Sequence, residues 1–158
     1  MRSWARVALG LVLAACAAPV AEPDSAAGPD ASAGECVVGT GVEEFIPIEP
    51  GDELALIAGP QGGYHVFSSV RVRGFIPPPV RIAVTLRRAD DDRYLGPTLT
   101  VGESTLREAS DGWREAFGLL SLVNDPSDAR GQEVVLRSVV SDASGALLHA
   151  DERRVRVR

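Results

Sequence analysis

The side chains that do chemistry most readily near neutral pH are scarce in this sequence of 158 residues. His65 and His149 are the only histidines, Cys16 and Cys36 are the only cysteines, and Met1 is the only methionine. A catalytic zinc site needs three protein ligands, and a blue-copper site needs two histidines, a cysteine and usually a methionine. The spacing brings no such set together and does not single out Cys36 with His65 as a thiol–imidazole pair. We therefore predict no metal, no cofactor and no catalytic residue.

Three consecutive carboxylates, Asp90, Asp91 and Asp92, raise the alternative of a calcium site, because Ca²⁺ takes about 6–8 oxygen ligands. Successive residues of an extended chain point apart, however, and the spacing of an EF-hand loop is missing. Arginines flank the run on both sides and compensate its charge. The run therefore predicts a solvated hairpin tip. For nucleophilic catalysis, the sequence has no G-x-S-x-G motif and no convincing Ser/His/Asp set.

The most distinctive motif is a glycine-rich stretch between two strand-like runs. It contains the residues of a candidate interaction loop: Gly59, Gln61, Gly62, Gly63, Tyr64 and His65. Glycine tolerates positive φ, so the stretch predicts a tight hairpin turn with His65 exposed. It is not a phosphate loop, because GK[ST] is absent and no helix follows. The region of residues 36–90 resembles a segment of uncharacterised lipoproteins from Gram-negative bacteria with GC-rich genomes, which implies no particular activity.

Short β-branched runs between glycines and prolines predict strands at residues 53–58, 64–73, 80–88, 132–141, 146–150 and 153–158. Alternation along these runs places one set of side chains inside: Val66, Val70, Ile82, Val84, Val155 and Val157. Residues 141–145 predict the turn of a hairpin. Residues 113–123 fit either a helix or a strand, and the internal Gly118 with the neighbouring strands favours a strand.

Repeated short strands without helices predict an all-β fold, an antiparallel two-sheet β-sandwich of about seven strands with immunoglobulin-like topology. The Cys…Trp…Cys spacing of antibody domains is absent. If Cys16 is modified, Cys36 has no partner in its own chain. Val37 and Val38 continue an apolar strand start, so we expect Cys36 to be a buried small hydrophobe. Pairing with a cysteine of another chain is the alternative.

The first sixteen residues have the layout of a secretory signal: a basic start, an apolar run over residues 7–15, and Cys16 after two small residues. The run is too short for a membrane-spanning helix, which needs about 20 residues. Leu13-Ala14-Ala15-Cys16 resembles the lipobox of bacterial lipoproteins. The resemblance implies removal of residues 1–15 and acylation of Cys16, for instance with palmitate, as a membrane anchor. An ordinary cleaved signal is the alternative.

Residues 16–35 follow as a disordered tether, since their small, acidic and proline-rich composition cannot bury enough apolar surface. Residues 36–158 then form the β-sandwich domain. Ala17 differs from the Asp that typically retains Gram-negative lipoproteins at the inner membrane, so the resemblance implies the outer membrane of the cell envelope. Without the two arginines of the signal, the formal net charge of −6 becomes about −8, which argues against nucleic acid as a partner.

These features predict a lipid-anchored envelope protein whose sandwich is an interaction or structural module and not an enzyme. Its expected partners are the membrane, through the lipid, and other envelope proteins. One alternative is a small-ligand or carbohydrate-binding module that uses exposed aromatic side chains, such as those of Tyr64, Phe67, Phe75 and Tyr94. A second alternative is a metal-dependent hydrolase that uses the loop from Gly59 to Gly63 with His65.

Overall fold

The computed structural model describes residues 34–60, 62–74 and 79–158. These residues form eleven strands and three short 3-10 helices. Four strands contain only two residues, so seven strands of four or more residues remain, in agreement with the prediction. The strands are β1 (Glu35–Thr40), β2 (Ile46–Pro47), β3 (Glu53–Leu54), β4 (Ile57–Ala58), β5 (Tyr64–Arg73), β6 (Arg81–Arg88), β7 (Leu99–Gly102), β8 (Arg107–Glu108), β9 (Arg114–Val123), β10 (Glu133–Ser141) and β11 (Leu147–Val157), and the 3-10 helices are η1 (Glu103–Thr105), η2 (Ser110–Gly112) and η3 (Pro126–Asp128).

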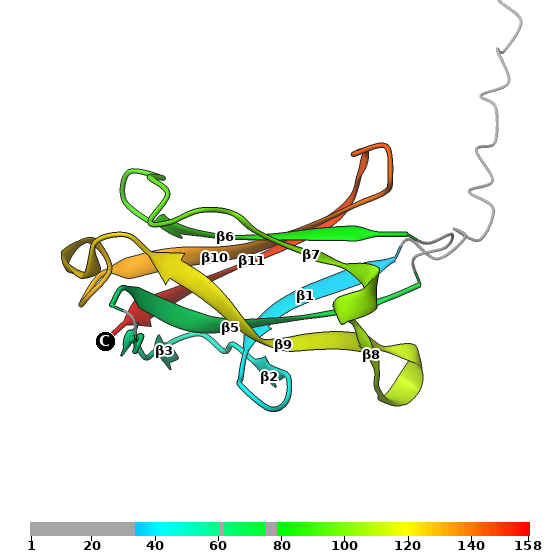
Figure 1. Ribbon diagram of the computed structural model, residues 1–158, viewed down its shortest axis with the longest axis horizontal. Coiled ribbons are helices and arrows are strands. Elements are labelled where there is room, and N and C mark those ends of the chain that lie inside the picture. The colour runs from blue at the N-terminus through cyan, green and yellow to red at the C-terminus, as the bar shows by residue number, and fades with distance from the viewer. Residues whose placement is uncertain (1–33, 61, 75–78) are drawn as a thin grey trace, which may run out of the picture.

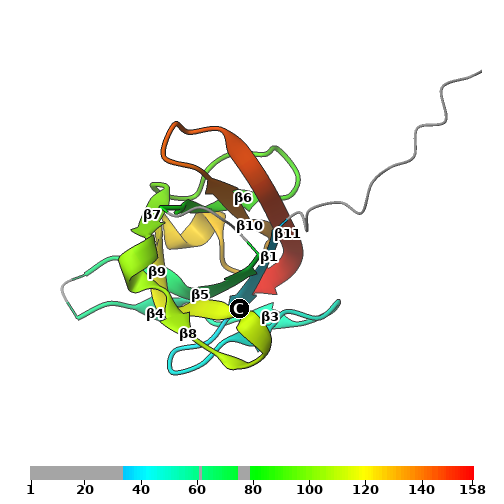
Figure 2. The same cartoon turned by 90° about the vertical axis from the view of Figure 1, so that its right-hand side faces the viewer.

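The strands form two sheets that pack face to face (Figure 1). Sheet A has the order β2-β1-β5-β9-β8, with β4 also paired to β5, and sheet B has the order β3-β11-β10-β6-β7. All pairings are antiparallel except that of β3 with β11. Figure 2 looks along the strands and shows the two layers enclosing the core. The predicted two-sheet β-sandwich is confirmed.

The order of the seven long strands is immunoglobulin-like. The first, second and fifth of them (β1, β5, β9) are neighbours in sheet A, and the seventh, sixth and third (β11, β10, β6) are neighbours in sheet B. The fourth long strand, β7, pairs with β6 in sheet B, whereas constant-type immunoglobulin domains place the fourth strand on the other sheet.

Alternation of side chains builds most of the core. The six residues predicted to lie inside are all buried, with at most 3% of their surface exposed. On β6, for example, Ile82, Val84 and Leu86 are buried while the residues between them are at least partly accessible. Residues 114–123 form a strand, as predicted. The period of two in the sequence therefore identifies the buried face correctly.

Two predicted strand boundaries are wrong. Residues 53–58 are not one strand, because β3 pairs with β11 of sheet B and β4 pairs with β5 of sheet A. The chain crosses between the sheets at this point, which a short apolar run does not reveal. Conversely, residues 146–150 and 153–158 are not separate strands, since β11 runs without a break from Leu147 to Val157 along β10. Charged residues at the centre of β11 interrupt its apolar pattern, so the sequence alone suggests two strands in place of one.

The sandwich has two distinct ends. At the end where β1 begins, Glu35 pairs with Arg73 at the end of β5. At the opposite end, the start of β5 meets β4 and the last residue of β9, Val123. The ten residues of β5 separate the two ends by roughly 30 Å. In the part of the chain that the structure describes, no helix is long and apolar enough to cross a membrane.

Candidate functional site

The structure separates the residues that sequence reasoning considered for chemistry. Cys36 points into the sandwich from β1 and pairs in register with Val72 of β5. His65 lies seven residues earlier on β5, roughly 23 Å along the strand. It also points to the other face of sheet A, because side chains alternate. Cys36 and His65 therefore form no thiol–imidazole pair.

Cys36 is a buried thiol, as predicted. Only 3% of its surface is exposed, and its Sγ lies 3.0 Å from Oγ of Ser138 on β10. This contact joins sheet A to sheet B across the core. Burial raises the pKa of the Cys36 thiol to about 11, with Ser138 acting in the opposite direction. The thiol is therefore protonated at neutral pH and poorly suited to act as a nucleophile.

The remaining titratable candidates lie elsewhere. Asp151 on β11 accepts a hydrogen bond from the backbone N–H of Val38, with 2.9 Å between nitrogen and Oδ2, and so covers the free edge of β1. His149 lies two residues earlier on β11, in the sheet opposite His65. Asp90 and Asp92 pair with Arg88 and Arg87 at an exposed turn, the predicted solvated tip. Among the described residues, no group of three or more metal-ligating side chains occurs.

The glycine-rich stretch forms the predicted hairpin turn. Ala58 of β4 pairs with Tyr64 of β5, and the backbone N–H of Gly59 donates to the carbonyl of Gly63 at 3.0 Å. Gly62 and Gly63 have φ values of 82° and 85°, which a side chain would strain. Gln61 lies outside the described residues. The turn therefore needs its glycines for its shape.

His65 is not exposed, which corrects the prediction. Its side chain lies on the outer face of sheet A, as the alternation requires, but only 9% of its surface is accessible. The ring packs edge-on against Phe67, with 5.1 Å between ring centroids and 82° between ring planes. Gly59, Gly62 and Gly63 line one hollow together with His65, so the turn lies next to the imidazole. The buried imidazole of His65 therefore packs between the loop and Phe67 and helps to hold the loop in place.

A hollow of about 510 Å³ opens between this loop and the end of β9. The glycines of the loop form one wall, and Leu120 and Leu122 form another. Both leucines point outward from β9 and are 45% and 47% exposed. They are the register partners of Phe67 and His65 on β5. The hollow is therefore mainly apolar and open to a partner side chain.

The segment after β1 crosses the outer face of sheet A and extends this apolar surface. The N–H of Gly118 in β9 donates to the carbonyl of Gly41 at 2.9 Å. At φ 67°, Gly118 sits in a left-handed conformation, and a Cβ there would lie 2.8 Å from the carbonyl oxygen of Val42. Only glycine permits this close crossing. The crossing leaves Val42 and Ile46 54% and 45% exposed, in one hollow with Phe67, the register partner of Leu120.

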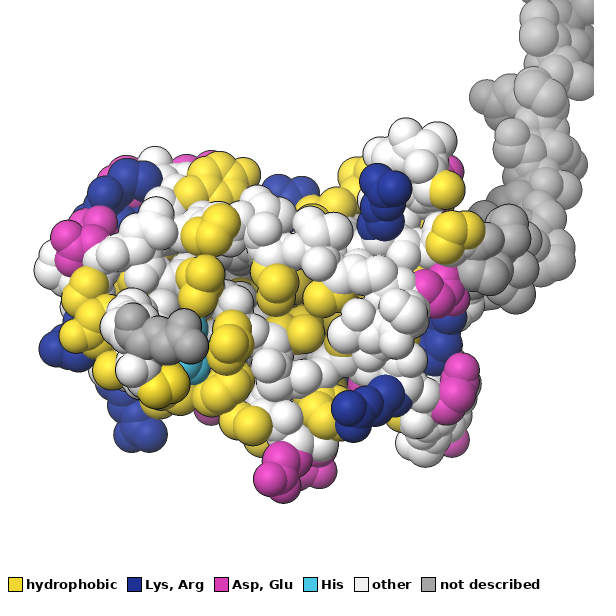
Figure 3. Space-filling model, in the orientation of Figure 1, with side chains coloured by type: hydrophobic (Ala, Val, Ile, Leu, Met, Phe, Trp, Pro, Cys, Tyr) yellow, Lys and Arg dark blue, Asp and Glu magenta, His cyan; other side chains and the backbone are white. Residues whose placement is uncertain are grey.

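We call the resulting surface the apolar face. Four of the seven exposed large hydrophobic side chains of the described residues belong to it. Figure 3 shows hydrophobic side chains gathered over the left-hand ends of β5 and β9, in the orientation of Figure 1. Its residues are Val42, Ile46, Ile57, Phe67, Leu120 and Leu122. Among the described residues, the hollows that they line contain no charged side chain, but Glu43 and Glu44 are exposed next to Val42 in the chain.

The other half of the same sheet face carries stacked arginines. The guanidinium of Arg71 lies between the rings of Phe45 and Trp113, 4.6 Å and 4.5 Å from their centroids. Arg73 contacts the ring of Trp113 as well, at 4.6 Å, and pairs with Glu35. Cation–π contacts of this kind hold the guanidinium plane in one orientation.

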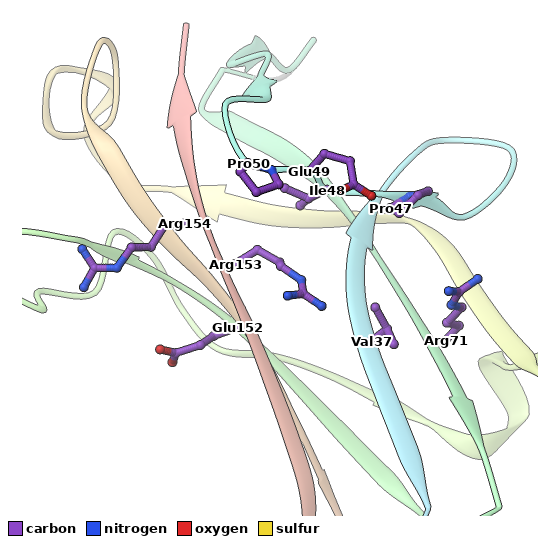
Figure 4. A pocket seen from close by; sticks show the side chains of 9 residues that line it. All are labelled: Val37, Pro47, Ile48, Glu49, Pro50, Arg71, Glu152, Arg153 and Arg154. Atoms are coloured by element: carbon purple, nitrogen blue, oxygen red, sulfur yellow. The ribbon is translucent and has the colours of Figure 1, made fainter.

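Arg71 also lines a second hollow, the Arg71 groove, of about 630 Å³. Figure 4 shows Arg153 of β11 extending toward β1, Val37 on β1 between the two arginines, and Pro47 and Ile48 above. Glu152 and Arg154 point away from β1 in the same view. The groove therefore combines an apolar floor with a fixed cation.

No protein-family model matches this sequence, and no curated protein matches it either. Sequence reasoning found the glycine loop but missed Leu120, Leu122 and Arg71 as surface features. The signal for the leucines was present: on a strand with Leu119 and Ser121 facing inward, Leu120 and Leu122 must face outward. The stacking of Arg71 on Phe45 had no local signal, because the two residues come together only through the crossing segment.

Proposed function

We propose that this chain is a lipid-anchored protein of the cell envelope whose β-sandwich docks another envelope protein through the apolar face. The observation that carries the proposal is the apolar face itself. A monomeric soluble protein rarely exposes a large contiguous apolar patch, and such patches commonly mark interaction sites. The hollows of the face are lined by uncharged residues, which favours a partner segment that inserts uncharged, apolar side chains.

The tether is a poor occupant for this face. Residues 17–33 contain only one branched aliphatic side chain, Val20, and no aromatic one. They therefore lack the large side chains that would fill the hollow beside Leu120 and Leu122. The tether also joins the domain at the β1 end, whereas the hollow lies at the opposite end. This arrangement supports a partner beyond the chain's own lipid anchor.

The alternatives have weaker support. A hydrolase using His65 would need other reactive groups near it, and Cys36, His149 and the aspartates lie elsewhere. A carbohydrate module would need exposed aromatic rings on one surface. Tyr64 and Phe67 are half-buried, Tyr94 is exposed, and Phe75 lies outside the described residues.

The anchor is tested by replacing Cys16, which lies outside the described residues. Cys16→Ser should release the protein from the membrane fraction or leave residues 1–15 attached, and either change is visible in the mass of the purified chain. Cys36→Ser serves as the matched control and should leave both mass and fractionation as in the wild type. Unchanged processing and membrane attachment of Cys16→Ser would contradict lipidation and with it the outer-membrane assignment.

Docking is tested separately, on gently solubilised envelopes. The chain should migrate on native gels in a complex larger than one copy, and Leu120→Arg with Leu122→Arg should shift it to the size of a monomer. Ala83→Arg with Thr85→Arg places the same charges, two residues apart, on the outer face of sheet B. This control should leave the complex intact. Equal effects of the two pairs would overturn the proposed docking surface.

A further inference from the structure

The Arg71 groove contains a cation that forms no direct ion pair with the described residues, although Glu115 is the register partner of Arg71 on β9. Arg71 takes part in none of the ion pairs formed by the described residues. Its Nε is buried and has no hydrogen-bond acceptor. An arginine side chain stays charged at any physiological pH, so burial of this group without an acceptor is costly. An anionic acceptor that reached this nitrogen would therefore stabilise the site.

The guanidinium is also fixed in place. Phe45 and Trp113 cover its two faces, which leaves the edge of the planar group for a ligand. A carboxylate accepts two parallel hydrogen bonds from such an edge, and a fixed plane lowers the entropy lost on binding. The stacked arrangement thus suits recognition of a planar carboxylate.

The rest of the groove determines what the carboxylate is attached to. Ile48 is 6% exposed and forms part of the floor, next to Val37 and Pro47. The volume of about 630 Å³ is within the usual range for small-ligand sites. Apolar side chains of this kind would hold a hydrocarbon or a leucine-like side chain.

The other charged groups of the groove are largely matched. The distance is 3.3 Å from Nη2 of Arg153 to Oδ2 of Asp151. It is 3.6 Å from Nη2 of Arg87 to Oε2 of Glu152 and also 3.6 Å from Nη1 of Arg154 to Oε2 of Glu133. Among the described lining residues, Glu49 is the one carboxylate outside any ion pair. Its negative charge would repel a dianion such as phosphate more strongly than a monocarboxylate.

We propose that the Arg71 groove binds a monocarboxylate with an apolar body, its carboxylate on Arg71 and its body over Val37, Pro47 and Ile48. A free organic acid and the carboxyl terminus of a peptide share this chemistry. The Arg71 groove is separate from the apolar face. Failure of the docking proposal would therefore leave this proposal unaffected, and the reverse also holds.

Fluorescence of Trp113 gives a direct readout, because its ring touches Arg71 and Trp4 is the only other tryptophan. In the full chain with Trp4→Phe, octanoate should change the emission with a saturable curve. Octanamide, which has the same body without the charge, should bind at least about tenfold more weakly. Acetyl-leucyl-leucine with a free or an amidated carboxyl group distinguishes a peptide terminus from a simple acid.

Variants locate the site, with calorimetry as a readout that does not depend on Trp113. Arg71→Gln should weaken octanoate binding at least about tenfold, whereas Glu49→Gln should strengthen it. Arg107→Gln is the control, since Arg107 also stacks on a ring, that of Phe117 at 5.1 Å, but does not line the groove. A flat titration of the parent chain, equal binding of octanamide, or unchanged binding by a folded Arg71→Gln variant would each overturn the proposal.

Discussion

The two sheets present very different outer faces. On sheet B, opposite charges alternate across the strands, with Glu152 near Arg87 and Glu133 near Arg154. On sheet A, β5 and β9 present the apolar face at one end and the aromatic-stacked Arg71 at the other. Both sheets bury the same kind of β-branched side chain on their inner faces. The difference between the outer faces is therefore not required by the fold.

This contrast supports our proposal that recognition occurs through sheet A. An antiparallel sheet needs only one apolar face to form a core, and its other face can be fully polar. Sheet B mostly follows that rule, with ion pairs over its centre, although Leu147 and Leu148 at the start of β11 are 63% and 43% exposed. Sheet A exposes Leu120 and Leu122 and leaves Arg71 without an ion pair. Covering the leucines or pairing the arginine would lower the free energy of the molecule, and this is the basis of that proposal.

The largest expected effect on stability tests which side chains of the strands face the core and which face the solvent. Val84→Asp should destabilise the domain severely, because a buried unpaired carboxylate costs about 3–5 kcal/mol and so removes much of a total stability of about 5–15 kcal/mol. Thr85→Asp, one residue further on the outer face of sheet B, should be tolerated, since its register partner is Arg137. Thermal unfolding measures both. A native-like melting curve for Val84→Asp would mean that the faces are misassigned.

The second effect comes from the thiol that joins the two sheets. Folding raises the pKa of Cys36 from 9.0 to about 11, so the folded state favours the protonated thiol. The stabilisation is fully present below pH 9 and is lost as the pH rises to about 11, a change of about 2–3 kcal/mol. Urea unfolding across this pH range measures it. Cys36→Ala should flatten the slope, and an equally steep slope in that variant would contradict the assignment.

A smaller effect compares single truncations on the two outer faces. His65→Ala should cost about 1–2 kcal/mol, because the ring supports the glycine loop and packs on Phe67. Glu152→Ala on sheet B should change the stability by less than about 0.5 kcal/mol. Equal costs at the two positions would remove the distinction between a packed and a solvated outer face.

The smallest effect concerns the ion pairs of sheet B. Glu133→Gln should change the free energy of unfolding by less than about 1 kcal/mol, because its contact with Arg154 is exposed. Added salt should reduce even that difference. A large loss in stability, measured by urea unfolding at low and high salt, would show that the sheet B face is itself a structural requirement.

The alternation of side chains predicted most of the fold. Val66, Ile82 and Val155 could be placed inside from their spacing alone, because a strand exposes alternate residues to one side. The crossing between β3 and β4 could not be predicted, since the run 53–58 looks the same whether it stays in one sheet or changes sheets. Pairing partners, not local propensity, decide that point.

The candidate sites were predictable only in part. The turn near Gly59 followed from its composition, but the burial of His65 depends on how the turn folds over the strand. The clamp on Arg71 depends on Phe45, which lies 26 residues earlier and arrives through the segment that crosses at Gly118. Contacts of this kind are set by tertiary structure and leave no local pattern.

The most direct test of recognition through sheet A compares photo-crosslinking from the two outer faces in intact envelopes. A photoreactive amino acid at Leu122, on the apolar face, should yield one defined adduct with another protein, and Leu120→Arg in the same chain should abolish it. The same probe at Thr100, exposed on β7 of sheet B, should yield none. Equal adducts from both faces, no adduct at Leu122, or an adduct of only twice the chain's mass would contradict the account.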